Sequence, residues 1–343
     1  MPTNTVTNPR VSILLPCRNA QETLPACIDS IRRQTFDQFE VIAVDDHSED
    51  QTDALLRQAA MDDIRFRFLR SPQPGLVPTL NYGLDQARCD LVARMDADDL
   101  MHPRRLELQT AHLQDNPGVD LLGSRVRGFP EGVLTDGFIE YLRWQNACIA
   151  ETVIRNDIYL ESPLAHPSVM FRRTVIRAAG GYLNGDFPED YELWLRLFHR
   201  DIRIEKLPQT LLDWRDDPNR TSRRDPRYSR QSFDKLRARY LIQDQRLVAN
   251  RDKIVIWGAG RVTRKRARHL LERGIRPVAW VDIDPNKIGN RLDRIPVVEP
   301  TWLRRRDKPF VLNFVAVHGA RECIEADLHR MNYRKGDDYL HIG

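Results

Sequence analysis

Short apolar runs alternate with segments of helical spacing over the first hundred residues, and this rhythm constrains the fold more than any other feature. Strands are expected at residues 11–15, 39–44, 66–69 and 91–95, and helices at 24–31, 51–59 and 76–87. Ser48 and Gln51 form an S-x-x-Q capping box, which predicts the start of the second helix. This order predicts the α/β class, with a mostly parallel sheet and helices on both faces.

The chain is long enough for two domains. It has 343 residues, of which 41% are hydrophobic and 30% are charged, and this is a globular composition able to bury a core. A new strand at residues 253–257 is followed by glycines and by a helix that reaches residue 271. We therefore expect one domain over residues 1–248 and a second over residues 249–343.

Charge, cysteine content and apolar patterning predict a cytoplasmic protein. The formal net charge of +4 is mild and does not argue for nucleic acid as a partner, although residues 200–239 are crowded with arginine. The five cysteines contain no C-x-x-C pair, and their odd number suits a reducing compartment. Residues 1–10 show no signal peptide, and no apolar run reaches the ~18–20 residues of a membrane span. Any contact with the inner face of the cell membrane would therefore be peripheral.

Polar residues gather where the expected strands end, and parallel sheets bind ligands at that edge. These residues are Pro16, Asn19, Asp45, Asp46, Asp96 and Asp98. Two aspartates that flank one residue of extended backbone point to the same side, so Asp96 and Asp98 can reach a ribose and a hard divalent cation. Such a cation, Mn²⁺ or Mg²⁺, would neutralise the charge on a departing nucleoside diphosphate. A solvated turn that caps the next helix is the alternative.

In these motifs the chain resembles family 2 of the inverting glycosyltransferases, which have the GT-A fold. The matching segments are residues 11–19, 44–48, 95–99, 180–182 and 189–197. The resemblance covers roughly residues 10–235 and implies a GT-A nucleotide-diphospho-sugar transferase fold there, and a small Rossmann-like α/β domain is expected after it from a separate motif described below. It also implies transfer of a sugar from a nucleotide-sugar donor to a glycan or lipid-linked acceptor, in cell-surface polysaccharide or lipopolysaccharide biosynthesis.

The resemblance assigns the donor site residue by residue. Pro16 and Asn19 would lie beside the base, Asp46 would bind the base and Asp45 would support that site. Asp96 would contact the ribose, and Asp98 would ligate the cation.

The resemblance makes Asp190 the general base, which takes a proton from the acceptor hydroxyl on the face opposite the leaving group. Asp190 follows Pro188 at an expected helix start, where the helix dipole favours its ionised form. Glu189, His166 and Trp194 are candidates for the acceptor site. A charge pair without chemistry is the alternative for the two acids, and a satisfied structural role is the alternative for His166.

A loop over residues 214–224 occupies the place where the family closes over the donor phosphates. Arg215 and Arg220 suit a diphosphate because a guanidinium forms bidentate hydrogen bonds. Asp217 stands where many relatives carry a histidine, and this departure could alter the metal preference. A solvated arginine-rich loop is the alternative.

The C-terminal region resembles the opening of a dinucleotide-binding domain. Gly258, Gly260 and Asp282 are its candidate nucleotide-binding residues, although Thr263 replaces the third glycine. The next helix is strongly basic, with Arg261, Arg264, Lys265, Arg266 and Arg268. A degenerate domain for packing, partner docking or homo-oligomer formation is the alternative.

Two other functions stay open at this point. One is an NAD-dependent oxidoreductase acting through residues 253–343, although no hydride-transfer constellation is visible. The other is a sugar nucleotidyltransferase, although residues 16–19 are not the glycine-rich loop of such enzymes.

Overall fold

The structure is a computed structural model that describes residues 8–217, 220–317 and 319–343, and the chain divides into two compact units. The first unit comprises the residues up to Glu151 together with Pro163–Gly185 and Glu189–Arg224. The second unit comprises Thr152–Ser162, Asp186–Pro188 and Asp225–Gly343. The second unit thus begins before residue 249, and residues 225–248 pack with the C-terminal sheet.

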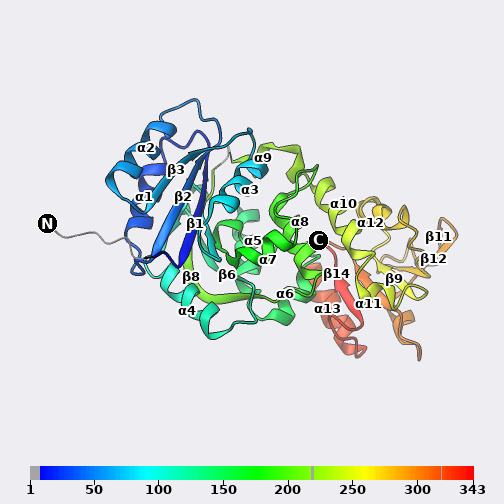
Figure 1. Ribbon diagram of the computed structural model, residues 1–343. Coiled ribbons are helices and arrows are strands. Elements are labelled where there is room, and N and C mark those ends of the chain that lie inside the picture. The colour runs from blue at the N-terminus through cyan, green and yellow to red at the C-terminus, as the bar shows by residue number, and fades with distance from the viewer. Residues whose placement is uncertain (1–7, 218–219, 318) are drawn as a thin grey trace. The chain divides into compact units, whose positions relative to one another are not determined.

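A mixed eight-stranded sheet lies at the centre of the first unit, in the order β3-β2-β1-β4-β7-β6-β8-β5 (Figure 1). Its strands are β1 (Val11–Cys17), β2 (Phe39–Asp45), β3 (Phe66–Arg70), β4 (Leu91–Arg94), β5 (Leu100–Met101), β6 (Leu121–Phe129), β7 (Met170–Arg172) and β8 (Ile204–Arg215). The first four strands are parallel, as predicted. Strand β7 is antiparallel to β4 and β6, and β5 is antiparallel to β8.

Helices cover both faces of the four parallel strands. The helices of this unit are α1 (Leu24–Arg32), α2 (Thr52–Asp62), α3 (Leu76–Gln86), α4 (Arg105–Asp115), α5 (Asp136–Ala147), α7 (Arg173–Ala178), α8 (Glu189–Phe198) and α9 (Thr221–Arg224). Ile13 and Leu15 of β1 pack in one core with Cys27 of α1. On the other face α3 lies so close that a Cβ atom at Gly83 would collide with Leu14 and come within 3.1 Å of Val44 Cγ2.

The predicted capping box is wrong. Helix α2 begins at Thr52, and no side chain caps its N-terminus. Ser48 Oγ instead accepts a hydrogen bond from Asn19 N at 3.0 Å, because a contact across two strand ends replaces the local cap. Farther along the chain, α10 (Arg230–Leu241) and α11 (Gln245–Val248) are two separate helices.

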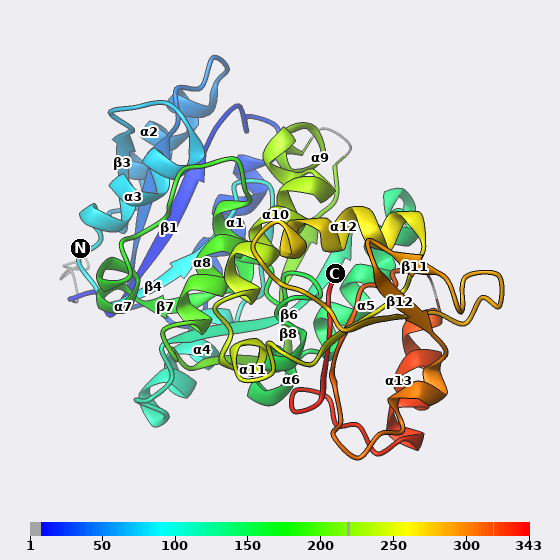
Figure 2. The same ribbon diagram turned by 90° about the vertical axis from the view of Figure 1, so that its right-hand side faces the viewer.

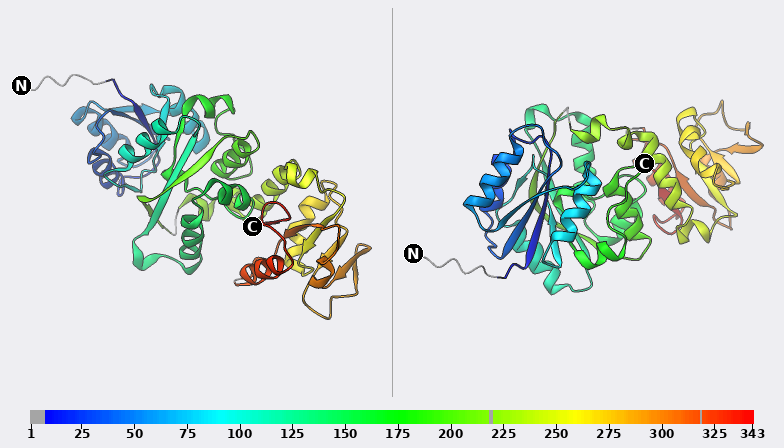
Figure 3. Two further views of the ribbon diagram at one scale, coloured as in Figure 1. Left: turned by 90° about the horizontal axis from the view of Figure 1, so that it is seen from below. Right: turned by 45° about the horizontal axis from the view of Figure 1, so that its top comes forward.

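A six-stranded sheet in the order β11-β12-β10-β9-β13-β14 forms the second unit. Its strands are β9 (Ile254–Trp257), β10 (Ala279–Val281), β11 (Arg291–Leu292), β12 (Ile295–Val298), β13 (Phe310–Asn313) and β14 (Tyr339–His341). Helices α6 (Glu151–Asp157), α12 (Arg261–Leu271) and α13 (Ala320–Arg330) complete it with α10 and α11. Figure 3 shows α12 and α13 on opposite sides of this sheet, and α13 packs on the side of Val255 and Val311.

The order of β9, the glycines, α12 and β10 is that of a Rossmann-like unit, as predicted. Among the residues that the structure describes, we find no helix that could serve as a transmembrane span.

Candidate functional site

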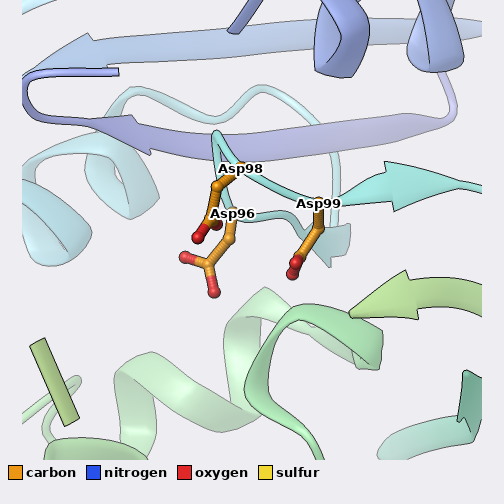
Figure 4. Close-up of side chains that lie close together, drawn as sticks. All are labelled: Asp96, Asp98 and Asp99. Atoms are coloured by element: carbon orange, nitrogen blue, oxygen red, sulfur yellow. The ribbon is translucent and has the colours of Figure 1, made fainter. Parts of the chain in front are cut away.

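Three carboxylates gather in the turn between β4 and β5. One oxygen each of Asp96, Asp98 and Asp99 lies within 4.8 Å of the others, and Figure 4 shows the three side chains on the same side of the turn. The backbone is not extended as we assumed, because Asp99 N donates to Asp96 O at 3.4 Å in a tight turn. The turn still brings Asp96 and Asp98 together, so the predicted pairing of these residues stands on a different geometry.

The carboxylates of this turn are costly to ionise together. Burial and the charge of Asp96 raise the pKa of Asp98 to about 6. Burial, with the charges of Asp98 and Asp96, raises the pKa of the fully buried Asp99 well above its usual range. Asp99 Oδ1 accepts a hydrogen bond from Arg215 N at 2.8 Å, but its Oδ2 is buried and has no hydrogen-bond partner among the described residues. A divalent cation would relieve this crowding, so the residues present fit the predicted metal site.

A buried arginine joins this turn to the predicted base. Arg94 ends β4, is only 2% exposed and forms an ion pair with Asp96. Its positive charge also lowers the pKa of Asp98 and that of Asp190. Sequence reasoning missed Arg94, although a cation that closes the apolar run at residues 91–93 was a signal for it.

Asp190 lies in the first turn of α8, as predicted, and is partly exposed. Burial in the surrounding protein, followed by the charge of Glu189, raises the pKa of Asp190 to about 7. Its Oδ1 accepts a hydrogen bond from Tyr191 N at 2.7 Å. The carboxylate is therefore held in place and changes its charge near neutral pH.

The three acceptor-site candidates lie in the interior behind Asp190. Glu189 is 2% exposed, and His166 Nδ1 lies 3.9 Å from its Oε1. His166 Nε2 is 2.9 Å from the hydroxyl of Tyr182, and burial lowers the pKa of this histidine well below its usual range. Trp194 is fully buried and packs edge-on against His166. In this structure Trp194 is therefore an interior residue whose contact with this part of the site is made through His166.

The predicted base-binding residues lie at the ends of β1 and β2. Pro16 is buried in β1, and its register partner in β2 is Val44. Asp45 Oδ1 accepts a hydrogen bond from Ser48 N at 3.2 Å, and Asn19 Oδ1 accepts one from Glu49 N at 2.9 Å. Both side chains therefore shape the loop that follows β2.

Asp46 lies beside this loop and is 4% exposed. Its Oδ1 accepts a hydrogen bond from Gly75 N at 2.7 Å, and its Oδ2 is 3.8 Å from Arg18 Nη1. The two strand ends and the carboxylate turn are close neighbours. Burial, followed by the charges of Asp45 and Asp96, raises the pKa of the Cys17 thiol.

The two arginines expected on the phosphates differ in their contacts. Arg215 Nε donates to Asp98 O at 2.7 Å, and the guanidinium lies 4.4 Å from the centre of the Phe129 ring. Arg215 therefore fastens the carboxylate turn to β8. Arg220 stacks 4.7 Å from the centre of the Trp214 ring, and its charge lowers the pKa of Asp98. Arg220 Nη1 also lies 3.9 Å from Asp216 Oδ1, so this guanidinium is held by an ion pair as well as by the ring.

The C-terminal candidates form a loop whose carboxylate, that of Asp282, already accepts a hydrogen bond from the glycine turn. Gly258 has a φ of 107°, which glycine adopts without strain, and Gly260 caps α12. Asp282 Oδ2 accepts a hydrogen bond from Ala259 N at 2.8 Å, and Lys287 Nζ lies 3.3 Å away. Asp282 thus fastens the glycine turn in this structure.

Comparison with known proteins identifies the family of the chain. The family model described as "Glycosyl transferase family 2" matches residues 12–180. The putative glycosyltransferase EpsE of Bacillus subtilis is 32% identical over 228 residues, which are 64% of this chain and 78% of EpsE. The Escherichia coli UDP-Gal:alpha-D-GlcNAc-diphosphoundecaprenol beta-1,3-galactosyltransferase is 33% identical over 150 residues, 44% of this chain and 52% of that protein.

A solved structure shows the same fold. The crystal structure of S. aureus TarS 1–349 in complex with UDP-GlcNAc aligns with a TM-score of 0.55 at 17% identity, over 69% of this chain and 67% of that chain. These findings give no support to the oxidoreductase alternative or to a nucleotidyltransferase. The chain belongs to glycosyltransferase family 2, has its GT-A fold and is a glycosyltransferase.

Proposed function

We propose that this glycosyltransferase is an inverting, cation-dependent enzyme in which Asp98 ligates the cation and Asp190 is the general base. The clustering of three carboxylates at the end of β4, those of Asp96, Asp98 and Asp99, carries the proposal. The charge of the buried Arg94 acts on the pKa of Asp98 and on that of Asp190, which links this cluster to the proposed base. In the proposed reaction, one group of carboxylates would hold the cation that assists departure of the nucleoside diphosphate, and the other carboxylate would take the proton of the acceptor.

The carboxylate turn is the proposed donor site. A divalent cation, Mn²⁺ or Mg²⁺, would neutralise the charge of the leaving diphosphate when bound there. Asp98 is the proposed ligand, and the unsatisfied Oδ2 of Asp99 makes the turn receptive to a positive charge. Asp96, held by Arg94, would accept a hydrogen bond from the donor ribose. Arg220 would bind oxygens of the donor diphosphate.

The ends of β1 and β2 are the proposed base site. Asp46 would accept the N–H of a pyrimidine base, while Asp45 and Asn19 hold the loop around it. Pro16 would form an apolar edge for the base.

Asp190 is proposed to take the proton from the acceptor hydroxyl as that oxygen attacks the anomeric carbon. Its pKa of about 7 suits this role, because a general base works best when its pKa is near the working pH. Glu189 and His166 would position the acceptor or the base, and Trp194 would act through His166.

The proposed acceptor is a hydroxyl of a glycan or of a lipid-linked sugar. The E. coli relative is named for a diphosphoundecaprenol-linked acceptor, which supports this class. We further propose a place in cell-surface polysaccharide or lipopolysaccharide assembly, at the cytoplasmic face of the membrane.

A donor screen tests the proposal. The purified chain would be given nucleotide sugars with and without Mn²⁺, and the released nucleoside diphosphate would be measured. Asp98→Asn and Asp190→Asn should each abolish transfer, whereas the exposed Asp37→Asn should leave it unchanged. Asp190→Asn should keep donor affinity in calorimetry, and Asp98→Asn should lose the part that depends on Mn²⁺. Full transfer by either site variant would refute the assignment.

A further inference from the structure

The second unit carries a strongly basic surface that the proposed chemistry does not use. Helix α12 contains no acidic residue, and its Arg261, Arg264, Lys265 and Arg268 are exposed. Helix α10 packs beside α12, as Figure 2 shows, and adds the exposed Lys235. We call these five side chains the basic face.

The two helices are locked together beneath this face. The buried Arg266 of α12 pairs with Asp234 of α10 at 3.2 Å and also donates to Phe314 O at 3.1 Å. Because Arg266 and Asp234 neutralise each other inside the unit, the exposed cations are presented on a fixed support.

A hollow of about 390 Å³ lies between α10 and α12, and cations dominate its wall. Lys235, Lys265, Arg268 and Arg273 line it, with Glu272 as the acidic member. Glu272 Oε1 accepts a hydrogen bond from Arg268 Nε at 2.9 Å, which leaves Lys235, Lys265 and Arg273 to set the charge of the hollow. A partner of the basic face must therefore be anionic.

We propose that the basic face docks on the surface of an anionic phospholipid bilayer, with lipid phosphates in the hollow between α10 and α12. Charge complementarity supports an anionic partner, since each Lys or Arg near an anionic membrane contributes about 1 kcal/mol. Val262 is 62% exposed within the basic face and offers an apolar contact with the interface. The described residues that line the hollow include no Phe, Tyr or Trp, on which single-stranded nucleic acid would stack, and their one ring is that of the half-buried His269. The choice of a lipid partner rests on the lipid-linked acceptor in the proposed function.

Vesicle flotation of the full-length chain tests this inference. The chain should float with vesicles of phosphatidylcholine containing 30% phosphatidylglycerol, should not float with pure phosphatidylcholine, and should be released by 0.5 M NaCl. The variant Lys235→Glu/Arg264→Glu/Lys265→Glu should bind the anionic vesicles at least ~10-fold more weakly. The matched variant Arg294→Glu/Arg304→Glu/Arg306→Glu has the same net charge on exposed sites outside α10 and α12, and it should bind like the wild type.

Three outcomes would overturn the inference: equal flotation with both vesicle types, equal loss in the two triple variants, or binding of a single-stranded oligonucleotide without binding of anionic vesicles. The flotation assay contains no sugar donor, so its result is independent of the proposed transfer reaction. Nucleoside diphosphate release with a water-soluble acceptor should be unchanged in the Lys235 triple variant.

Discussion

The pH dependence of transfer offers the sharpest test of the proposed base. Asp190 has a pKa of about 7, raised first by burial and then by the charge of Glu189. The base acts in its ionised form, so activity should be full above pH 7 and should fall as the pH drops through 7. About half of the carboxylate is ionised at its pKa, about one tenth one unit below and about one hundredth two units below. The value of kcat/KM should therefore fall about 5-fold between pH 7 and pH 6, and about 10-fold more between pH 6 and pH 5.

Glu189→Gln is the perturbation that links this profile to the structure. It removes the second cause of the raised pKa and leaves the first, so the acidic limb should move to lower pH. Because burial is the larger cause, the displacement should be smaller than the rise that burial produces, on the order of one pH unit.

The assay is nucleoside diphosphate release from pH 5 to 9 at saturating donor. Protonation of Asp98, with a pKa of about 6, could produce a similar limb through loss of the cation. A 10-fold increase in Mn²⁺ separates the two, because a cation competes with protons at Asp98 but not at Asp190. A flat profile, a limb that follows the Mn²⁺ concentration, or an unchanged limb in Glu189→Gln would refute the reasoning.

Three further predictions concern the buried charges and the core. In the wild type the charge of Arg94 lowers the pKa of Asp190, so Arg94→Met should move the acidic limb to higher pH. It should also lower the free energy of unfolding in urea by about 1–3 kcal/mol. Arg94→Lys should restore most of the pH profile and most of the stability. Without metal, the wild type should gain about 1 kcal/mol of unfolding free energy relative to Asp190→Asn from pH 8 to pH 6, because the folded-state pKa of Asp190 lies above the unfolded value and protonation favours the folded state; an unchanged or opposite difference measured in EDTA would contradict this. Gly83→Ala should destabilise the chain by about 1–3 kcal/mol through collision in the core, whereas Gly137→Ala, which meets no atom within 4 Å, should be neutral or stabilising by thermal melting.

The parallel half of the first sheet could be predicted from the sequence because its signals are local. Strands β1 to β4 are apolar runs separated by helical periods, and both patterns are complete within a few residues. Strand β7 has only three residues and joins the sheet through pairing with β4 and β6, so its antiparallel direction depends on contacts far along the chain. Strand β6 and helix α5, in the region 124–160, gave no clear period and were not predicted.

The residues of the candidate site differ in the same way, since some follow from local signals and others depend on contacts far along the chain. Asp45, Asp46, Asp96 and Asp98 could be predicted because strand ends of a parallel sheet share one edge. The hydrogen bond from Arg215 N to Asp99 joins residues 116 positions apart, and no local pattern predicts such a contact. The role of Asp282 could not be predicted either, because a carboxylate after a strand serves a ribose or its own loop equally well.

The two bonds between Arg215 and the carboxylate turn make the site a linked system. Arg215 N donates to Asp99 and its Nε donates to Asp98 O, so the segment that carries Arg220 leaves the sheet from a point tied to the turn. By thermodynamic linkage, a bound cation changes the binding free energy of the donor by the same amount as a bound donor changes that of the cation. Cation affinity should therefore increase when the donor diphosphate engages Arg220, and donor affinity should increase equally when the cation is bound.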